Sequence, residues 1–123
     1  MNDGESGIPN RERARLIAVG VDGFAMAASM VQYAIELAAE RPGRVLVVAA
    51  YRVPDGLADL VTADHARHAA ASRIRWAMSR VRVPPRMQVD VLVAPGDPAR
   101  VLAEVDASAD VLVIGRHQAE FLP

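Results

Sequence analysis

Short apolar runs alternate along this chain with longer segments whose apolar residues recur every three or four positions. Three runs, Leu16–Val21, Arg44–Tyr51 and Asp110–Gly115, have cores that are apolar throughout. Continuous apolar runs of this length are typical of parallel strands buried on both faces. A fourth segment, Met87–Ala94, places valine at every second position, which predicts an edge strand with one wetter face.

The segments between the strands predict three helices, Ala25–Glu40, Leu57–Val83 and Pro98–Asp106. The third has the strongest start signal, because Asp97 can cap a helix whose first residue is proline. The residues expected to face the core are Met26, Met30, Tyr33, Ala34, Leu37 and Ala38 in the first helix, and Leu60, Ala63, Ala70, Ile74, Ala77 and Val81 in the second.

This alternation of strands and helices predicts an α/β fold with a parallel sheet and right-handed crossovers. The chain has 123 residues, which is the size of one domain. We expect a flexible leader at residues 1–12, the domain at residues 13–117 and a tail at residues 118–123. With 52% hydrophobic but only 4% aromatic residues, the core must consist of Val, Leu, Ile and Ala.

Composition excludes several kinds of chemistry. Cysteine is absent, which excludes disulfides, thiolate metal sites and cysteine nucleophiles and fits a reducing compartment. All 14 basic residues are arginine, so chemistry that needs lysine is excluded. The net charge of −1 gives no general attraction for nucleic acid, and no apolar run is long enough to span a membrane. We therefore expect a cytoplasmic protein that binds neither nucleic acid nor membrane.

Asp22 and Gly23 follow the first strand directly, where ligands bind in open parallel sheets. A carboxylate there can accept hydrogen bonds from a ribose hydroxyl or an adenine amino group. It can equally cap the first helix. The residues alone leave both roles open.

The second helix carries two further polar groups. Its arginines could bind a phosphate-bearing partner or an acidic protein surface, or they could simply be solvated, which is the commoner outcome. These arginines are Arg67, Arg73, Arg75, Arg80 and Arg82. Asp64, His65 and His68 form the only cluster that resembles metal ligands, and its two histidines share a helix face. A site still needs about three protein ligands, and no nearby residue supplies the third. We expect no metal.

The sequence lacks a dinucleotide-binding glycine motif, a P-loop and a nucleophile elbow. No acid–base pair or nucleophile is assembled, so we do not expect an enzyme.

Three stretches together resemble the universal stress protein family. They are residues 16–23, residues 45–54, and residues 89–99 continued through the third helix to residues 109–115. The last stretch is the most specific, with Gly-Asp-Pro-Ala followed by Ala-Asp-Val-Leu-Val-Ile-Gly. The resemblance covers residues 15 to about 117. It implies a doubly wound, Rossmann-like parallel sheet with helices on both faces, of which this chain supplies four strands in the order 3-2-1-4.

The resemblance also implies an adenine-nucleotide site. Asp22, with Gly23 beside it, matches the family's first-strand aspartate, Ala50 matches the position lining adenine, and Gly115 matches the first glycine of the phosphate motif. The second glycine position is occupied by Gln118, and the sequence ends before the last glycine. Glycines allow backbone N–H groups to approach phosphate. We therefore expect no bound cofactor and loss of the usual mode of ATP binding.

The family's fourth helix and fifth strand are not in this sequence. We expect this to expose the edge of the fourth strand, Val111, Leu112, Val113 and Ile114, to a second copy or a protein partner, together with Phe121-Leu122. The first hypothesis is thus a non-catalytic domain that acts in stress response by association, as a homodimer or with a partner. The alternative is a regulatory domain that binds ATP or AMP through Asp22, with arginines such as Arg116 at the phosphates. An enzyme of the wider adenine-nucleotide α-hydrolase-like group is a third possibility.

Overall fold

The computed structural model describes residues 15–23, 25–53 and 60–115, and within them strands and helices alternate. The elements are β1 (Arg15–Gly20), α2 (Ala27–Ala39), β2 (Gly43–Tyr51), α3 (Leu60–Met78), β3 (Gln88–Pro95), α4 (Pro98–Asp106) and β4 (Val111–Val113). Each predicted strand and helix is present within a few residues of its expected bounds. The expected leader at residues 1–12 and the tail at residues 118–123 lie outside the described residues.

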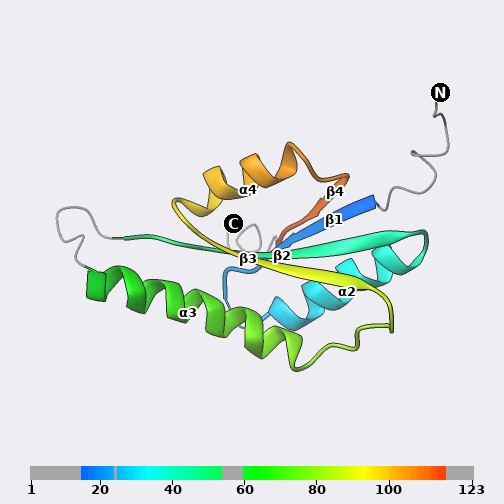
Figure 1. Ribbon diagram of the computed structural model, residues 1–123, viewed down its shortest axis with the longest axis horizontal. Coiled ribbons are helices and arrows are strands. Elements are labelled where there is room, and N and C mark those ends of the chain that lie inside the picture. The colour runs from blue at the N-terminus through cyan, green and yellow to red at the C-terminus, as the bar shows by residue number, and fades with distance from the viewer. Residues whose placement is uncertain (1–14, 24, 54–59, 116–123) are drawn as a thin grey trace, which may run out of the picture.

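The strands form one parallel sheet in the order β3-β2-β1-β4, as predicted. Ile17 of β1 lies between Val45 of β2 and Val111 of β4. Helices α2 and α3 cover one face, and α4 covers the other (Figure 1). The chain changes face after β3, because the crossover to β4 passes β2 and β1 in the opposite direction to the first two crossovers.

Both faces of β1 and β2 are buried, which explains why these strands are apolar at successive positions. Toward α2 and α3 they present Ile17, Val19, Val45 and Val47, each fully buried. Toward α4 they present Ala18 and Val48, which form a second, smaller cluster with Val101 and Val105 of the helix.

The predicted buried face of the first helix is partly wrong. Met26 and Tyr33 are exposed, while Ala27, Val31 and Ile35 pack in the core. Apolar residues occupy more than half of the circumference of α2, so the helical period alone does not select one face. The sheet selects the row of small and β-branched residues, which lets the helix approach closely.

The second helix ends at Met78, not at Val83. The Ser79 hydroxyl donates a hydrogen bond to the Trp76 carbonyl at 2.7 Å, and the Arg80 N–H donates to the Ala77 carbonyl at 3.0 Å. These short-range bonds satisfy carbonyl groups that a longer helix would have used. Val81 packs against the core from the segment that follows the helix.

The two edges of the described sheet are β3 and β4, so the prediction of β3 as an edge strand is confirmed. Strand β4 is shorter than predicted, and Asp110 precedes it. The Asp110 carboxylate accepts the Leu16 N–H at 2.7 Å, and the Asp110 N–H donates to the Leu16 carbonyl at 2.9 Å. Within the described segments, none of the helices is long and apolar enough to cross a membrane.

Candidate functional site

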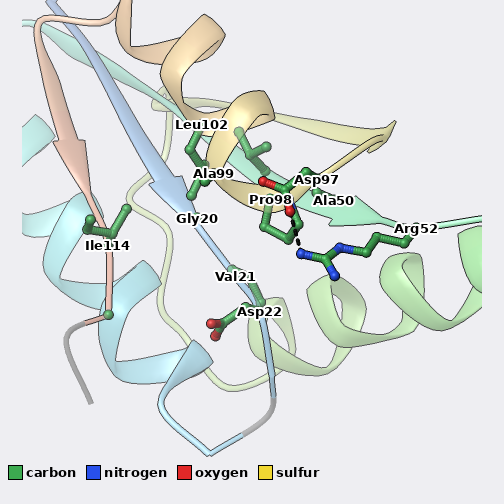
Figure 2. Close-up of a pocket in the computed structure, with 12 residues that line it drawn as sticks. Gly20, Val21, Asp22, Ala50, Arg52, Asp97, Pro98, Ala99, Leu102 and Ile114 are labelled. Carbon is green, nitrogen blue, oxygen red and sulfur yellow. Dashed lines mark hydrogen bonds and ion pairs between the residues drawn. The ribbon is translucent and has the colours of Figure 1, made fainter. Parts of the chain in front are cut away.

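A pocket of about 400 Å³ opens where β1 and β2 end and α4 begins (Figure 2). Its walls combine apolar side chains with two carboxylates and one guanidinium. The lining residues are Gly20, Val21, Asp22, Val48, Ala50, Arg52, Asp97, Pro98, Ala99, Leu102, Ile114 and Gly115. This position, beyond the carboxyl ends of parallel strands where the direction of winding changes, is where α/β sheets bind ligands. Its volume suits a small organic molecule.

Gly20 allows α4 to pack directly against the end of β1. A Cβ atom at this position would lie 2.9 Å from a methyl carbon of Leu102. The next residue, Val21, is buried, and its N–H donates to the Val48 carbonyl at 2.8 Å. This bond extends the contact between the first two strands to the floor of the pocket, so Asp22 is the first exposed residue beyond it.

Gly96 turns the chain from β3 into α4. Its φ of 134° lies in a region that residues with a side chain rarely adopt. Its N–H donates to the Tyr51 carbonyl at 2.8 Å, which holds the turn against the end of β2. Asp97 then takes the N-cap position and Pro98 begins the helix, as predicted. The N-terminal end of α4, with the positive end of its dipole, therefore borders the pocket.

Asp97 and Arg52 form an ion pair across the pocket wall (Figure 2). The predicted side-chain cap is wrong in one respect. Asp97 occupies the N-cap position but makes no capping hydrogen bond, because its carboxylate bonds to the Arg52 guanidinium instead. Both side chains are largely exposed, so the pair can open at low cost when a charged ligand binds.

Asp22 does not cap the following helix. The N-cap of α2 is Met26, without any side-chain cap bond. The Asp22 carboxylate is exposed and makes no hydrogen bond or ion pair within the described chain. In Figure 2 it points toward the side on which β4 ends, away from Arg52. Its acceptor oxygens are thus available to a ligand.

The structure brings three of the four predicted site residues together. Asp22, Ala50 and Gly115 line the same pocket, whereas Gly23 does not. Gln118 lies outside the described residues. Sequence reasoning missed Arg52, although its place directly after the second strand was a usable signal. It also missed Leu102 and Ile114, for which the sequence carries no signal of pocket lining.

Among the other polar groups of α3, Asp64 has partners on its own helix. Asp64 accepts a hydrogen bond from Arg67 at 2.7 Å and lies 3.5 Å from His68 Nδ1. The Arg67 bond, helped by His68, holds the pKa of the Asp64 carboxyl below its usual value. No three potential metal ligands group together in residues 15–23, 25–53 and 60–115.

Two arginines of this region, one on α3 and one just beyond its end, serve the fold. Arg73 donates to the Ala50 carbonyl at 3.2 Å, and so joins α3 to the end of β2. The Arg80 guanidinium lies 4.4 Å from the ring centre of Trp76, a cation–π contact.

Two comparisons with known proteins, one with family models and one with solved structures, agree with the resemblance found in the sequence. The model of the universal stress protein family matches residues 14–123. A search of curated proteins finds no significant match.

Solved universal stress proteins have similar folds. One in complex with cAMP gives a TM-score of 0.65 at 19% identity, over 82% of this chain and 75% of that one. UspA from Lactobacillus plantarum gives 0.61 at 18%, over 84% and 77%. A member from Burkholderia pseudomallei gives 0.57 at 21%, over 87% and 86%. At these identities the similarity establishes the fold: a Rossmann-like α/β sheet with helices on both faces.

Proposed function

This chain belongs to the universal stress protein family, and we propose that it acts in the stress response as a regulatory domain that binds an adenine nucleotide in the strand-end pocket. Family membership indicates the stress-response role. The ligand is our inference from the geometry of the pocket and from one relative of similar fold, which was solved in complex with cAMP.

The observation that carries this proposal is the convergence of Asp22, Ala50 and Gly115 on one pocket. The three residues come from the ends of three different strands and are separated by dozens of positions in the sequence. The same three positions match the residues with which members of the family bind nucleotide. The pocket's volume of about 400 Å³ is in the range typical of small-molecule sites.

Each part of the lining has a role in this proposal. The Asp22 carboxylate accepts hydrogen bonds from ribose hydroxyls or from the adenine amino group. Val48 and Ala50 provide an apolar surface for the base. The α4 N-terminus and Arg52 attract the anionic group, through the helix dipole and a charge-assisted hydrogen bond.

Thermal unfolding with AMP, cAMP or ATP at millimolar concentration tests this function. A ligand present at a hundred times its Kd should raise the free energy of unfolding by about 2.7 kcal/mol. Asp22→Ala should weaken binding at least about tenfold, since it removes the acceptor for the ligand's hydroxyl or amino groups. Its effect on the stability of the unliganded protein should be within about 0.5 kcal/mol, because Asp22 is exposed and has no partner among the described residues.

The matched control is Asp106→Ala, which removes an exposed carboxylate at the far end of α4. It should leave binding unchanged. A protein that no adenine nucleotide stabilises would contradict the proposal, and so would binding that survives Asp22→Ala.

The edge of β4 supports a second candidate function, association with a second copy or a protein partner. Within the described chain β4 pairs with β1 alone. Its residues Val111, Leu112 and Val113 are half-buried, and Ile114 beyond them is 45% exposed. Apolar strand edges with free backbone groups favour pairing with another chain.

Light scattering and hydrogen exchange test association. We expect a dimer or larger complex in which the amides of residues 111–114 are protected, and Ile114→Glu should shift it toward monomer. A monodisperse monomer whose amides exchange freely at these positions would rule out pairing through β4.

A further inference from the structure

A second concavity lies on the opposite face of the sheet, between α3 and the edge strand β3. Its volume is about 510 Å³. It is lined by four residues of α3, by the serine that follows the helix and by one valine of β3: Ala71, Ile74, Arg75, Met78, Ser79 and Val91. We call it the α3–β3 groove. The helical residues recur at three- and four-residue spacing, so they form one continuous stripe.

Val91 shows that the apolar surface of the sheet extends beyond the cover of its helices. It lies opposite Val47 in the neighbouring strand, and Val47 is fully buried. Val91 itself is 52% exposed, although it lies in the middle of a strand. Together with Ile74 and Met78 it offers an apolar floor that a binding partner could cover.

The backbone beside this floor is an unprotected strand edge. Strand β3 pairs with β2 in continuous register from Gln88 to Pro95, and no described strand pairs with its outer side. Natural edge strands are commonly protected by shortness, by bulges, by lysines or by proline. Here the strand spans eight residues without a bulge, and its proline is the last residue.

The charge at the groove is positive. The Arg75 guanidinium donates to the Ser72 hydroxyl at 3.1 Å and forms no ion pair within the described residues. Arg67 and Arg100, in contrast, pair with Asp64 and Glu104. The sequence contains no acidic residue from position 65 to position 89. A carboxylate brought to the groove would meet an Arg75 that has no ion-pair partner among the described residues.

We propose that an extended, acidic segment of a partner protein adds to the outer edge of β3, places apolar side chains in the α3–β3 groove and pairs a carboxylate with Arg75. Strand addition supplies main-chain hydrogen bonds, while the groove and the arginine select the sequence. A second copy of this chain fits less well, because two-fold pairing of β3 with itself would bring like-charged surfaces together.

The test uses the full chain and a capped peptide as long as β3. One face of the peptide carries valines and a single glutamate, so that both residue types face the groove, and the alternate positions on its other face are threonine. In a titration followed by NMR, this peptide should shift the backbone amides of residues 88–95 and protect them from exchange. The matched peptide has lysine in place of glutamate. It should bind at least about fivefold more weakly, because it replaces attraction to Arg75 with repulsion.

Two variants locate the contact. Val91→Glu should weaken binding of the glutamate peptide about tenfold, since it removes apolar surface and adds a repelling charge. Arg75→Gln should weaken it about two- to fivefold, as expected for an exposed ion pair. Both positions are on the surface, so the variants should fold, and far-UV circular dichroism checks this. Arg100→Gln, an exposed arginine on α4, should bind like the wild type.

Two results would overturn the proposal: no shift in residues 88–95 with the glutamate peptide at millimolar concentration, or equal binding of the lysine peptide. Self-association that Val91→Glu abolishes would also overturn it, and would assign the edge of β3 to a second copy.

Discussion

The two faces of the sheet differ in how completely they are covered. Two helices close the face formed by Ile17, Val19, Val45 and Val47, and the core there is continuous. On the other face only α4 covers the strands within the described chain, and its buried cluster is small. The strand-end pocket lies beside this cluster and shares Val48 with it.

Because of this difference, one face of the sheet contributes mainly to stability, while the other leaves room for a ligand. A face that is fully closed removes the most apolar area from water and contributes most to folding. A face covered by one short helix leaves the carboxyl ends of the strands open to a ligand. The α3–β3 groove occurs on the closed face only at its margin, where the helices no longer reach Val91.

The largest loss of stability should follow truncation of a side chain in the core between the sheet and helices α2 and α3. Ile17→Ala should lower the free energy of unfolding by about 3–5 kcal/mol, because Ile17 is fully buried on the central strand and its surroundings cannot collapse into the cavity. Urea unfolding measures this loss. Ile114→Ala is the matched control at an exposed position, and it should cost less than about 1 kcal/mol. Similar losses in both variants would show that the two faces do not differ as described.

A sharper comparison uses two adjacent valines of β2 that point to opposite faces. Val47→Ala should lower the free energy of unfolding by about 2–3 kcal/mol, because it leaves a cavity in the closed core. For Val48→Ala the loss should be about 1 kcal/mol smaller than for Val47→Ala, since the space it creates joins the pocket and can take up water. Urea unfolding of both variants checks the ranking. An equal or reversed cost would contradict it.

The substitutions of Val47 and Val48 should also differ in their effect on ligand affinity. If the pocket binds a nucleotide, only Val48→Ala should change the affinity, because Val47 faces away from the pocket.

A smaller effect on stability is expected from the ion pair at the pocket wall. A double-mutant cycle of Arg52→Ala and Asp97→Asn should give a coupling energy of about 0.2–1 kcal/mol, as for other exposed ion pairs. In the proposed function, Asp97→Asn should also strengthen binding of AMP relative to adenosine, because it frees Arg52 for the phosphate. Calorimetric titration with both ligands measures this. Equal changes for AMP and adenosine would show that Arg52 does not contact the anionic group.

The smallest effect is expected at Asp64, on the exposed surface of α3. Its pKa is lower in the folded protein than the ordinary value of 3.8, so its ion pairs stabilise the fold above that value and are lost as the pH falls through the folded pKa. Asp64→Asn should leave the thermal midpoint at neutral pH unchanged within error, since the residue is exposed. A clear drop near pH 7 would show that Asp64 has a larger structural role.

Part of the candidate site followed from the sequence. Asp22 follows the first strand, at the edge of a parallel sheet where ligands bind, and the resemblance to the family added Ala50 and Gly115. The sequence could not reveal that Arg52 takes the Asp97 carboxylate away from its helix, because this contact joins residues 45 positions apart. It also left two roles open for Asp22, and only the observed start of α2 excluded the cap.

Local patterns were sufficient for the elements, and the resemblance to the family implied their order in the sheet. Strand burial on both faces, helical periodicity and the Asp97-Pro98 start signal all depend on residues close in sequence, and crossover handedness then restricts the topology. The buried side of α2, the Arg52–Asp97 pair and the exposed margin at Val91 were decided only by tertiary packing. Each depends on which surfaces of the sheet and its helices meet. Side-chain volumes and distances in the folded chain determine which surfaces these are.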